Sequence, residues 1–215
     1  MATMPVKVKI CGITNWVDAR RATQAGAEFL GFNFYRASPR YISPAAATQI
    51  ARRLPKKVAT VGVFVNEREK KIEEIVRVVG LDFIQLHGDE SPVMVKRLSR
   101  LRPVIKALRV RASLSVARLA RFAGADAILL DRYDPKRRGG TGKSFDWDAA
   151  RAASRTRRIF LAGGLSPENV AVAIRMARPY AVDVCSGVES KPGKKDPARM
   201  LALIRIARGR RRRSK

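Results

Sequence analysis

Short apolar segments alternate along this chain with segments whose apolar residues recur at helical spacing. The strand-like segments begin near Val6, Phe29, Ala59, Asp82, Val104, Asp126, Ile159 and Ala181. Between them, stripes such as the one over 72–79, closed by Gly80, are typical of amphipathic helices. Segments 61–65 and 127–130 are apolar on both faces, as strands buried between helices are. The pattern predicts eight strand-then-helix units with parallel strands.

Eight such units in 215 residues match one small (β/α)8 barrel, the TIM-barrel fold. A doubly wound open sheet is the alternative, but it has edges and usually about five or six strands. We therefore predict an α/β protein with a single barrel over residues 1–207 and a basic, disordered tail over 208–215. Four helices are expected to begin with a capping oxygen before a proline, at Ser43-Pro44, Ser91-Pro92, Ser166-Pro167 and Asp196-Pro197.

The spacing of the strand starts also indicates where the functional loops lie. The intervals are similar except after the second and sixth strands, where they widen. The loops that follow the strands build the active face of a barrel. Segments 35–43 and 132–145 are therefore expected to cover a substrate.

The chain is strongly basic, with 45 Lys and Arg against 18 Asp and Glu and a net charge of +27. Part of this charge lies in the tail, and the rest is spread over expected helix faces. Such a field attracts polyanions, so weak, non-specific nucleic-acid binding through the tail is a second function to consider. The tail has no interleaved aromatic residues, so sequence-specific recognition is not expected.

Several protein classes are disfavoured by composition. No apolar run is long enough to span a membrane, and the N-terminus lacks the apolar core of a signal peptide. Two cysteines, Cys11 and Cys185, are too few for a disulfide framework, and their spacing fits no zinc site. We expect a cytoplasmic monomer or homodimer without a metal.

Polar residues gather at the expected strand ends, where a barrel would bring them to one rim. They are Cys11, Asn33, Arg40, Asn66, Gln85, His87, Lys106, Asp131 and Asp183, with the pairs Gly163-Gly164 and Ser186-Gly187. The two glycine-containing turns follow the last two strands, where barrels commonly bind phosphate through backbone N–H groups. The sequence therefore predicts a phosphate site there.

Cys11 and Asp131 are the candidate proton carriers. A cysteine that ends a core strand is most often a small buried side chain, but Lys9 on the same strand face favours a thiolate. Asp131 ends an apolar strand, where burying an unpartnered carboxylate costs several kcal/mol. An acid and a base in a phosphate-anchored pocket point to proton transfer on a sugar phosphate.

Several motifs in register resemble those of phosphoribosylanthranilate isomerase. They are KICGITN at 9–15, GFNFY at 31–35, SPRYISP at 38–44, VGVFVN at 61–66, QLHG at 85–88, GGTGKSFDW at 139–147, AGGL at 162–165 and DVCSGVE at 183–189. The match runs in order over nearly the whole chain. Another phosphosugar isomerase on the same barrel is disfavoured, because such enzymes differ around Cys11 and Arg40.

The resemblance implies the Amadori rearrangement of tryptophan biosynthesis, without metal or cofactor. In that family, N-(5-phosphoribosyl)anthranilate becomes 1-(2-carboxyphenylamino)-1-deoxyribulose 5-phosphate. Cys11 matches the family's general base and Asp131 its general acid. Asp131 would protonate the furanose ring oxygen, and Cys11, as a thiolate, would remove the proton on C2. Since an ordinary thiol has a pKa of about 8.5, the site should lower the pKa of Cys11.

The resemblance also implies a substrate-binding set: Arg40, His87, Gly140, Gly163, Gly164, Asp183, Ser186 and Gly187. Arg40 matches the residue that pairs with the anthranilate carboxylate, although a solvated loop arginine is the plain alternative. Asp183 matches a supporting carboxylate near the anthranilate amine. His87 is either a pocket residue or a structural hydrogen-bonding residue. The basic field is expected to speed encounter with this substrate, which carries a phosphate and a carboxylate.

Cys185 departs from the family pattern, which has Ser at this position. The first and last strands of a closed barrel are neighbours, so Cys11 and Cys185 are expected close to each other. A disulfide between them requires Cα atoms within about 7 Å.

Overall fold

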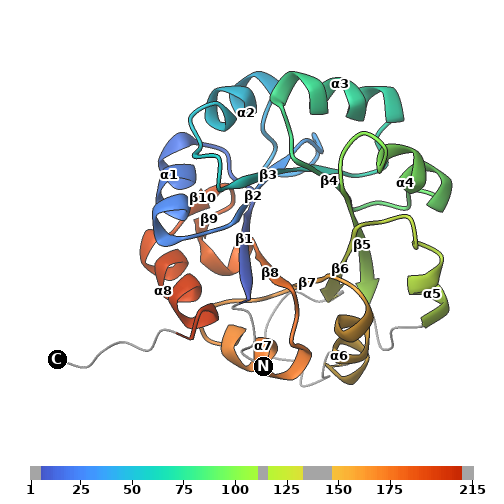
Figure 1. The fold of residues 1–215 in the computed structure, drawn as a ribbon. Coiled ribbons are helices and arrows are strands. Elements are labelled where there is room, and N and C mark those ends of the chain that lie inside the picture. Colours follow the sequence, from blue (N-terminus) through green and yellow to red (C-terminus); the bar gives the residue numbers. More distant parts are fainter. Residues whose placement is uncertain (1–5, 111–115, 133–146, 210–215) are drawn as a thin grey trace.

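Eight parallel strands form a closed barrel in chain order, and β1 completes it by pairing with β8 (Figure 1). The computed structural model describes residues 6–110, 116–132 and 147–209. The strands are β1 (Lys7–Cys11), β2 (Phe29–Asn33), β3 (Ala59–Phe64), β4 (Phe83–Leu86), β5 (Val104–Val110), β6 (Ala127–Arg132), β7 (Ile159–Ala162) and β8 (Ala181–Val184). The predicted barrel is confirmed.

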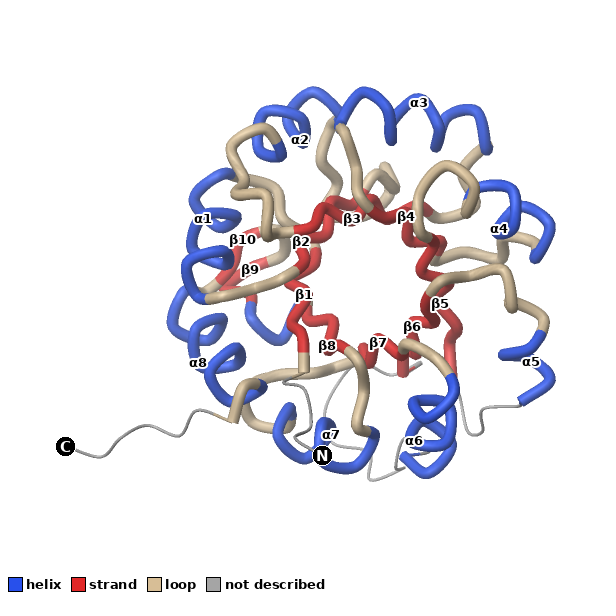
Figure 2. Tube along the Cα trace, in the orientation of Figure 1, coloured by secondary structure: helices blue, strands red, loops and turns tan. Residues whose placement is uncertain are grey.

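Helices surround this ring of strands on the outside (Figure 2). They are α1 (Trp16–Ala25), α2 (Pro44–Ala51), α3 (Glu69–Val79), α4 (Pro92–Leu98), α5 (Val116–Ala120), α6 (Trp147–Thr156), α7 (Val170–Ala177) and α8 (Pro197–Ala207). Within the described ranges, no helix is both long and apolar enough to cross a membrane.

The alternating faces of the strands build two hydrophobic cores. Val8 and Ile10 of β1 belong to the larger core, which lies between strands and helices. The smaller core includes Phe29, Phe160 and Leu129, and the rings of Phe29 and Phe160 meet edge to face at 5.3 Å. Because Phe29 and Phe160 lie near the amino ends of their strands, apolar side chains close that end of the barrel.

Most of the predicted helix starts are confirmed by their caps. The side chains of Ser43, Ser91 and Asp196 accept backbone hydrogen bonds at the starts of α2, α4 and α8. The start predicted at Ser166-Pro167 was wrong, because α7 begins at Val170. Here the Asn169 side chain accepts a hydrogen bond from the Ser166 N–H and donates one to the Gly164 carbonyl. These bonds hold the segment before α7 in a turn.

A short hairpin between β8 and α8 was not predicted. It follows a 3-10 turn, η1 (Ser186–Val188), and pairs β9 (Glu189–Lys191) with β10 (Lys194–Lys195) in antiparallel fashion. The Thr14 hydroxyl donates to the Gly193 carbonyl at 2.6 Å, and the Lys195 N–H donates to Asp18 at 2.9 Å. The hairpin is thus anchored to the start of α1.

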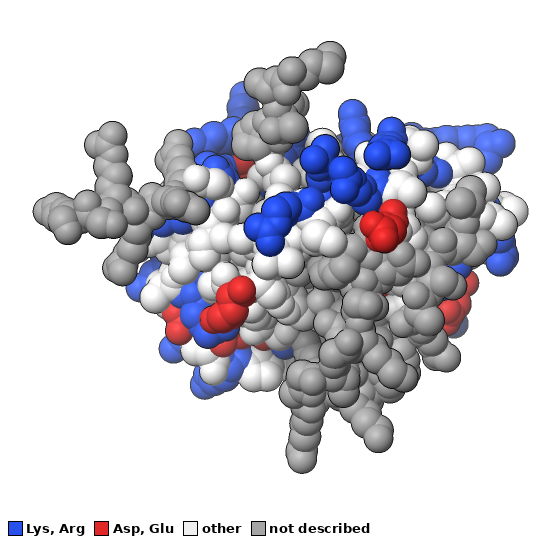
Figure 3. Space-filling model, turned by 90° about the horizontal axis from the view of Figure 1, so that it is seen from below, with Lys and Arg blue, Asp and Glu red and all other residues white. Residues whose placement is uncertain are grey.

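Basic side chains are spread over the surface, and acidic ones are few on the face shown in Figure 3. The paired basic residues of the expected helix faces, such as Arg20-Arg21 and Arg52-Arg53, are exposed. Arg208, the first residue of the predicted tail, contacts the barrel, because its guanidinium pairs with Glu28 at 2.6 Å. Residues 210–215 lie outside the described part of the chain, so their disorder stays a prediction.

Lys106 on β5 is a strand-end residue with a structural role. Its side chain is 2% exposed, and its ammonium group lies 2.7 Å from the Glu90 carboxylate and 2.7 Å from the Gly88 carbonyl. Glu90 also accepts hydrogen bonds from the N–H groups of Asn66 and Gly88. The pair therefore ties the segments after β3 and β4 to β5, and Lys106 does not line the pocket described below.

Replacing Lys106 by Met is expected to lower the free energy of unfolding by about 3 to 5 kcal/mol, because it leaves the Glu90 carboxylate buried and unpaired. Urea titration measures the change. As a control, Lys56→Met alters an exposed lysine and should change stability by less than about 0.5 kcal/mol. Adding Glu90→Gln to Lys106→Met should recover part of the loss. Equal stability of Lys106→Met and Lys56→Met would contradict a stabilising role for the Lys106–Glu90 ion pair.

Candidate active site

A cavity of about 230 Å³ opens at the carboxyl ends of the strands. It is lined by most of the residues predicted from the sequence: Cys11, Arg40, His87, Asp131, Gly163, Gly164, Asp183 and Ser186. Gly187 follows Ser186 but is not itself part of the lining, and Gly140 falls outside the described residues. The structure thus brings together residues of β1, β6 and β8 and residues of the segments that follow β2, β4, β7 and β8.

Cys11 ends β1 in a strongly polar environment. A hydrogen bond from the Cys185 thiol lowers the pKa of Cys11; burial opposes this, and the positive charges of Lys9 and Lys195 support it. The same bond and burial raise the pKa of Cys185. Of the two thiols, Cys11 is therefore the one that loses its proton first.

Lys9 and Asp183 form a buried ion pair beside Cys11. The Lys9 ammonium group lies 2.9 Å from both carboxylate oxygens of Asp183. Burial alone would lower the pKa of Lys9, but the charges of Asp183 and Cys11 raise it above its usual value. Burial raises the pKa of Asp183 to about 6, although the charge of Lys9 opposes that rise. Lys9 thus stays a cation at neutral pH and favours the thiolate.

His87 connects Asp131 to the wall of the barrel. Its Nε2 atom lies 3.1 Å from Asp131 Oδ2, and the Gln85 amide nitrogen lies 2.9 Å from its Nδ1 atom. Because the Gln85 NH2 group is a donor, this arrangement makes Nδ1 the acceptor and places the proton of a neutral imidazole on Nε2. His87 is therefore both a pocket residue and a hydrogen-bond partner that holds Asp131.

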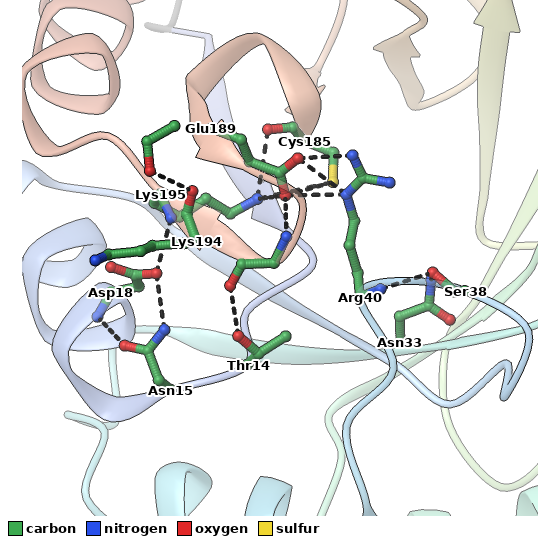
Figure 4. A network of polar contacts seen from close by, with 12 residues as sticks. Thr14, Asn15, Asp18, Asn33, Ser38, Arg40, Cys185, Glu189, Lys194 and Lys195 are labelled. Carbon is green, nitrogen blue, oxygen red and sulfur yellow. Dashed lines mark hydrogen bonds and ion pairs between the residues drawn. The ribbon is translucent and has the colours of Figure 1, made fainter.

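Arg40 reaches the pocket from the segment between β2 and α2, and the hairpin holds its guanidinium (Figure 4). Its Nε and Nη2 atoms donate to Glu189 at distances of 2.6 to 3.1 Å. The Lys195 ammonium group, fully buried, lies 3.0 Å from the same carboxylate. Burial alone would raise the pKa of Glu189, but the bonds from Arg40 and Lys195 lower it to about 2. Arg40 is thus a fixed cation at the rim.

The two predicted phosphate turns lie against each other. Gly163 and Gly164 both have positive φ angles, 89° and 70°, which favour glycine. A Cβ atom at Gly187 would overlap the carbonyl oxygen of Leu165, so only glycine allows this close approach. The turns after β7 and β8 therefore form one wall, with Ser186 facing the cavity.

Sequence reasoning gave no role to Glu189 and Lys195. Lys195 resembled one more surface lysine in a basic chain, and Glu189 was only the last residue of a motif. The available signal was Pro192-Gly193 between basic residues, because such a dipeptide is typical of a turn. A hairpin there would have turned both side chains toward the eighth strand.

The fold and this pocket define a (β/α)8-barrel protein with its functional site at the carboxyl ends of the strands. Residues 8–205 match the family model for N-(5'-phosphoribosyl)anthranilate (PRA) isomerase. The chain therefore belongs to the N-(5'-phosphoribosyl)anthranilate isomerase family.

Individual relatives are similar to this chain over almost their full lengths. The isomerase of Citrifermentans bemidjiense is 52% identical over 202 residues, which are 94% of this chain and 97% of that protein. The phosphoribosyl anthranilate isomerase of Thermotoga maritima superposes with a TM-score of 0.88 at 45% identity, covering 95% of this chain and 99% of its own. A phosphoribosyl anthranilate isomerase in complex with reduced 1-(o-carboxyphenylamino)-1-deoxyribulose 5-phosphate has a TM-score of 0.85 at 42% identity, with the same coverage.

Proposed function

We propose that this chain converts N-(5-phosphoribosyl)anthranilate to 1-(2-carboxyphenylamino)-1-deoxyribulose 5-phosphate by general acid–base catalysis. The observation that carries the proposal is the position of Cys11 and Asp131 in the lining of one cavity, beside two packed glycine turns. Family membership supports the same reaction.

The reaction begins with Asp131 as the acid. Its carboxyl group donates a proton to the furanose ring oxygen, and the ring opens to an iminium ion. The His87 Nε2–H group, bound to Asp131 Oδ2, steadies the carboxylate that forms. Asp131 is partly exposed, which lets it recover a proton from solvent between turnovers.

Cys11 then acts as the base. Its thiolate removes the proton on C2 of the iminium ion, and the enolamine that results relaxes to the ketone. Lys9 and Lys195 stabilise the thiolate without competing for the C2 proton, because both are cations. Cys185 donates its proton toward the Cys11 sulfur and so supports the same charge state.

The two ends of the substrate have separate sites. The turns after β7 and β8 bind the phosphate through backbone N–H groups, with Ser186 beside them. At the opposite end, Arg40 pairs with the anthranilate carboxylate. Among the described residues, Glu189 occupies the Nε and Nη2 atoms of Arg40, which leaves Nη1 for the substrate.

Turnover of freshly generated phosphoribosylanthranilate by the full chain tests this function. We expect formation of the ketose product without added metal or cofactor. Absence of turnover, or equal turnover of a sugar phosphate that lacks the anthranilate group, would contradict it. We propose the cytoplasm as the compartment, because a chain with two cysteines has too few for a disulfide framework.

Replacing Glu189 by Gln is expected to raise KM at least ~10-fold and to change kcat less than ~3-fold, because charge-assisted bonds that orient Arg40 are lost. Steady-state kinetics measures both constants. The control is Glu168→Gln, which alters an exposed glutamate paired with Arg199 and should leave both unchanged. A lower KM in Glu189→Gln would mean that Glu189 competes with the substrate for Arg40, and would contradict a positioning role.

A further inference from the structure

Cys11 ends β1, and Cys185 directly follows the neighbouring strand β8. The β1–β8 register pairs Lys9 with Asp183 and Ile10 with Val184, and Cys11 and Cys185 are the residues that follow the last pair on the two sides. Neighbouring strands of a sheet lie about 4.8 Å apart. Disulfides span Cα distances of about 4.4 to 6.8 Å. The backbone therefore places the two cysteines within bridging distance.

The side chains have room to meet. Both cysteines are free and half-buried, and both line the cavity. A Cβ atom at Gly12 would lie 2.9 Å from the Cys185 sulfur, and one at Gly31 would lie 2.7 Å from the Cys11 sulfur. Because both positions are glycine, the sulfurs occupy space that side chains would otherwise fill. The thiols already interact, since each shifts the proton affinity of the other.

We propose that Cys11 and Cys185 are a redox modification site, at which a peroxide forms a reversible disulfide that closes the active site. The Cys11 thiolate attacks one peroxide oxygen, the O–O bond breaks, and a sulfenic acid and hydroxide form; the hydroxide takes up the proton that Cys11 had released and becomes water. The Cys185 sulfur then attacks the Cys11 sulfur, its proton leaves with the hydroxyl group, and a second water is released. Two thiols are oxidised to one disulfide, and one hydrogen peroxide is reduced to two waters.

The residues around the two cysteines favour these two oxidation steps. Lys9 and Lys195 hold Cys11 in the anionic form that attacks peroxide, and the Lys195 ammonium group lies 3.7 Å from the Cys185 sulfur, where it supports the second thiolate. A resolving cysteine beside a low-pKa cysteine prevents oxidation to the sulfinic acid, which is irreversible in most proteins. Formation of the disulfide does not depend on the proposed function. The loss of activity does, because it rests on the catalytic role proposed for Cys11.

Treatment of the reduced full chain with a small molar excess of hydrogen peroxide tests the proposal. We expect the mass of the intact monomer to fall by that of two hydrogen atoms and neither thiol to be titratable. Turnover should fall at least ~10-fold, and dithiothreitol should restore it completely. The Cys185→Ser variant is compared with its own reduced sample. Peroxide should add oxygen atoms to this variant and lower its turnover, and dithiothreitol should not restore that turnover.

Three results would overturn the proposal. They are persistence of both thiols under peroxide, a disulfide between two chains, and a wild-type chain that gains oxygen as Cys185→Ser does. The mass and thiol measurements remain decisive if the chain fails to turn over phosphoribosylanthranilate. Failure of the proposed function is therefore distinguishable from failure of this inference.

Discussion

Replacing Cys11 by Ala is expected to reduce kcat at least ~1000-fold, because a positioned base contributes about 100- to 10,000-fold and methyl has no basic atom. The cavity keeps its other walls, so the reduced product analogue should bind within a few-fold of the wild-type affinity. Steady-state kinetics and calorimetric titration measure the two quantities. Equal losses of binding and turnover would assign Cys11 to substrate binding and not to catalysis.

The pH profile gives this prediction a second readout. The thiolate is the active form, and the pKa of Cys11 is lowered, so the acid limb of kcat/KM, on which Cys11 gains its proton, should lie at lower pH than it would for an ordinary thiol. Lys9→Met removes one positive charge, and the acid limb should then move to higher pH. An unmoved acid limb in Lys9→Met would show that the group which titrates there is not Cys11.

Replacing Asp131 by Asn is expected to reduce kcat by a similar factor, at least ~1000-fold, since an amide cannot donate a carboxyl proton to the ring oxygen. Asn is nearly isosteric, and its carbonyl oxygen still accepts the hydrogen bond from His87. Affinity for the reduced product analogue should therefore change little. Turnover and calorimetry of the variant measure both effects.

The control for Asp131 is an exposed aspartate at the start of α6. Asp148→Asn removes a surface charge without touching the pocket, so its turnover should equal that of the wild type. If Asp131→Asn retained more than about a tenth of the wild-type kcat, ring opening would not depend on this carboxyl group.

The barrel was predictable because its signals are local. The apolar stripe of α3 ends at Gly80, which has a φ angle of 73°, and the serines at 43 and 91 cap the helices that follow them. Strand ends in a barrel meet at one rim, so Cys11 and Asp131 could be assigned to one pocket without knowledge of their contacts. The parity of β1 likewise placed Lys9 on the same face as Cys11.

The ion pairs were not predictable, because each joins residues far apart in the sequence. Lys9 alternates with apolar residues, as an exposed lysine would, yet Asp183 on β8 makes its full burial possible. Glu189 and Lys195 become part of the site only when the hairpin folds back on α1, and that depends on Asp18. The start of α7 differs from the prediction for a local reason, since the Asn169 side chain accepts a hydrogen bond from the Ser166 N–H and holds the preceding turn.

We propose that Asp131 protonates the ring oxygen and that Cys11 removes the proton on C2 of the same sugar, which is held by its phosphate. A crystal structure of this chain with the reduced product analogue measures that arrangement directly. The account predicts the phosphate at the turns after β7 and β8, the Cys11 sulfur within about 3.5 Å of the C1–C2 unit, and Asp131 beside the oxygen of the opened ring. An analogue bound in the reverse orientation, or with its C1–C2 unit out of reach of Cys11, would contradict it.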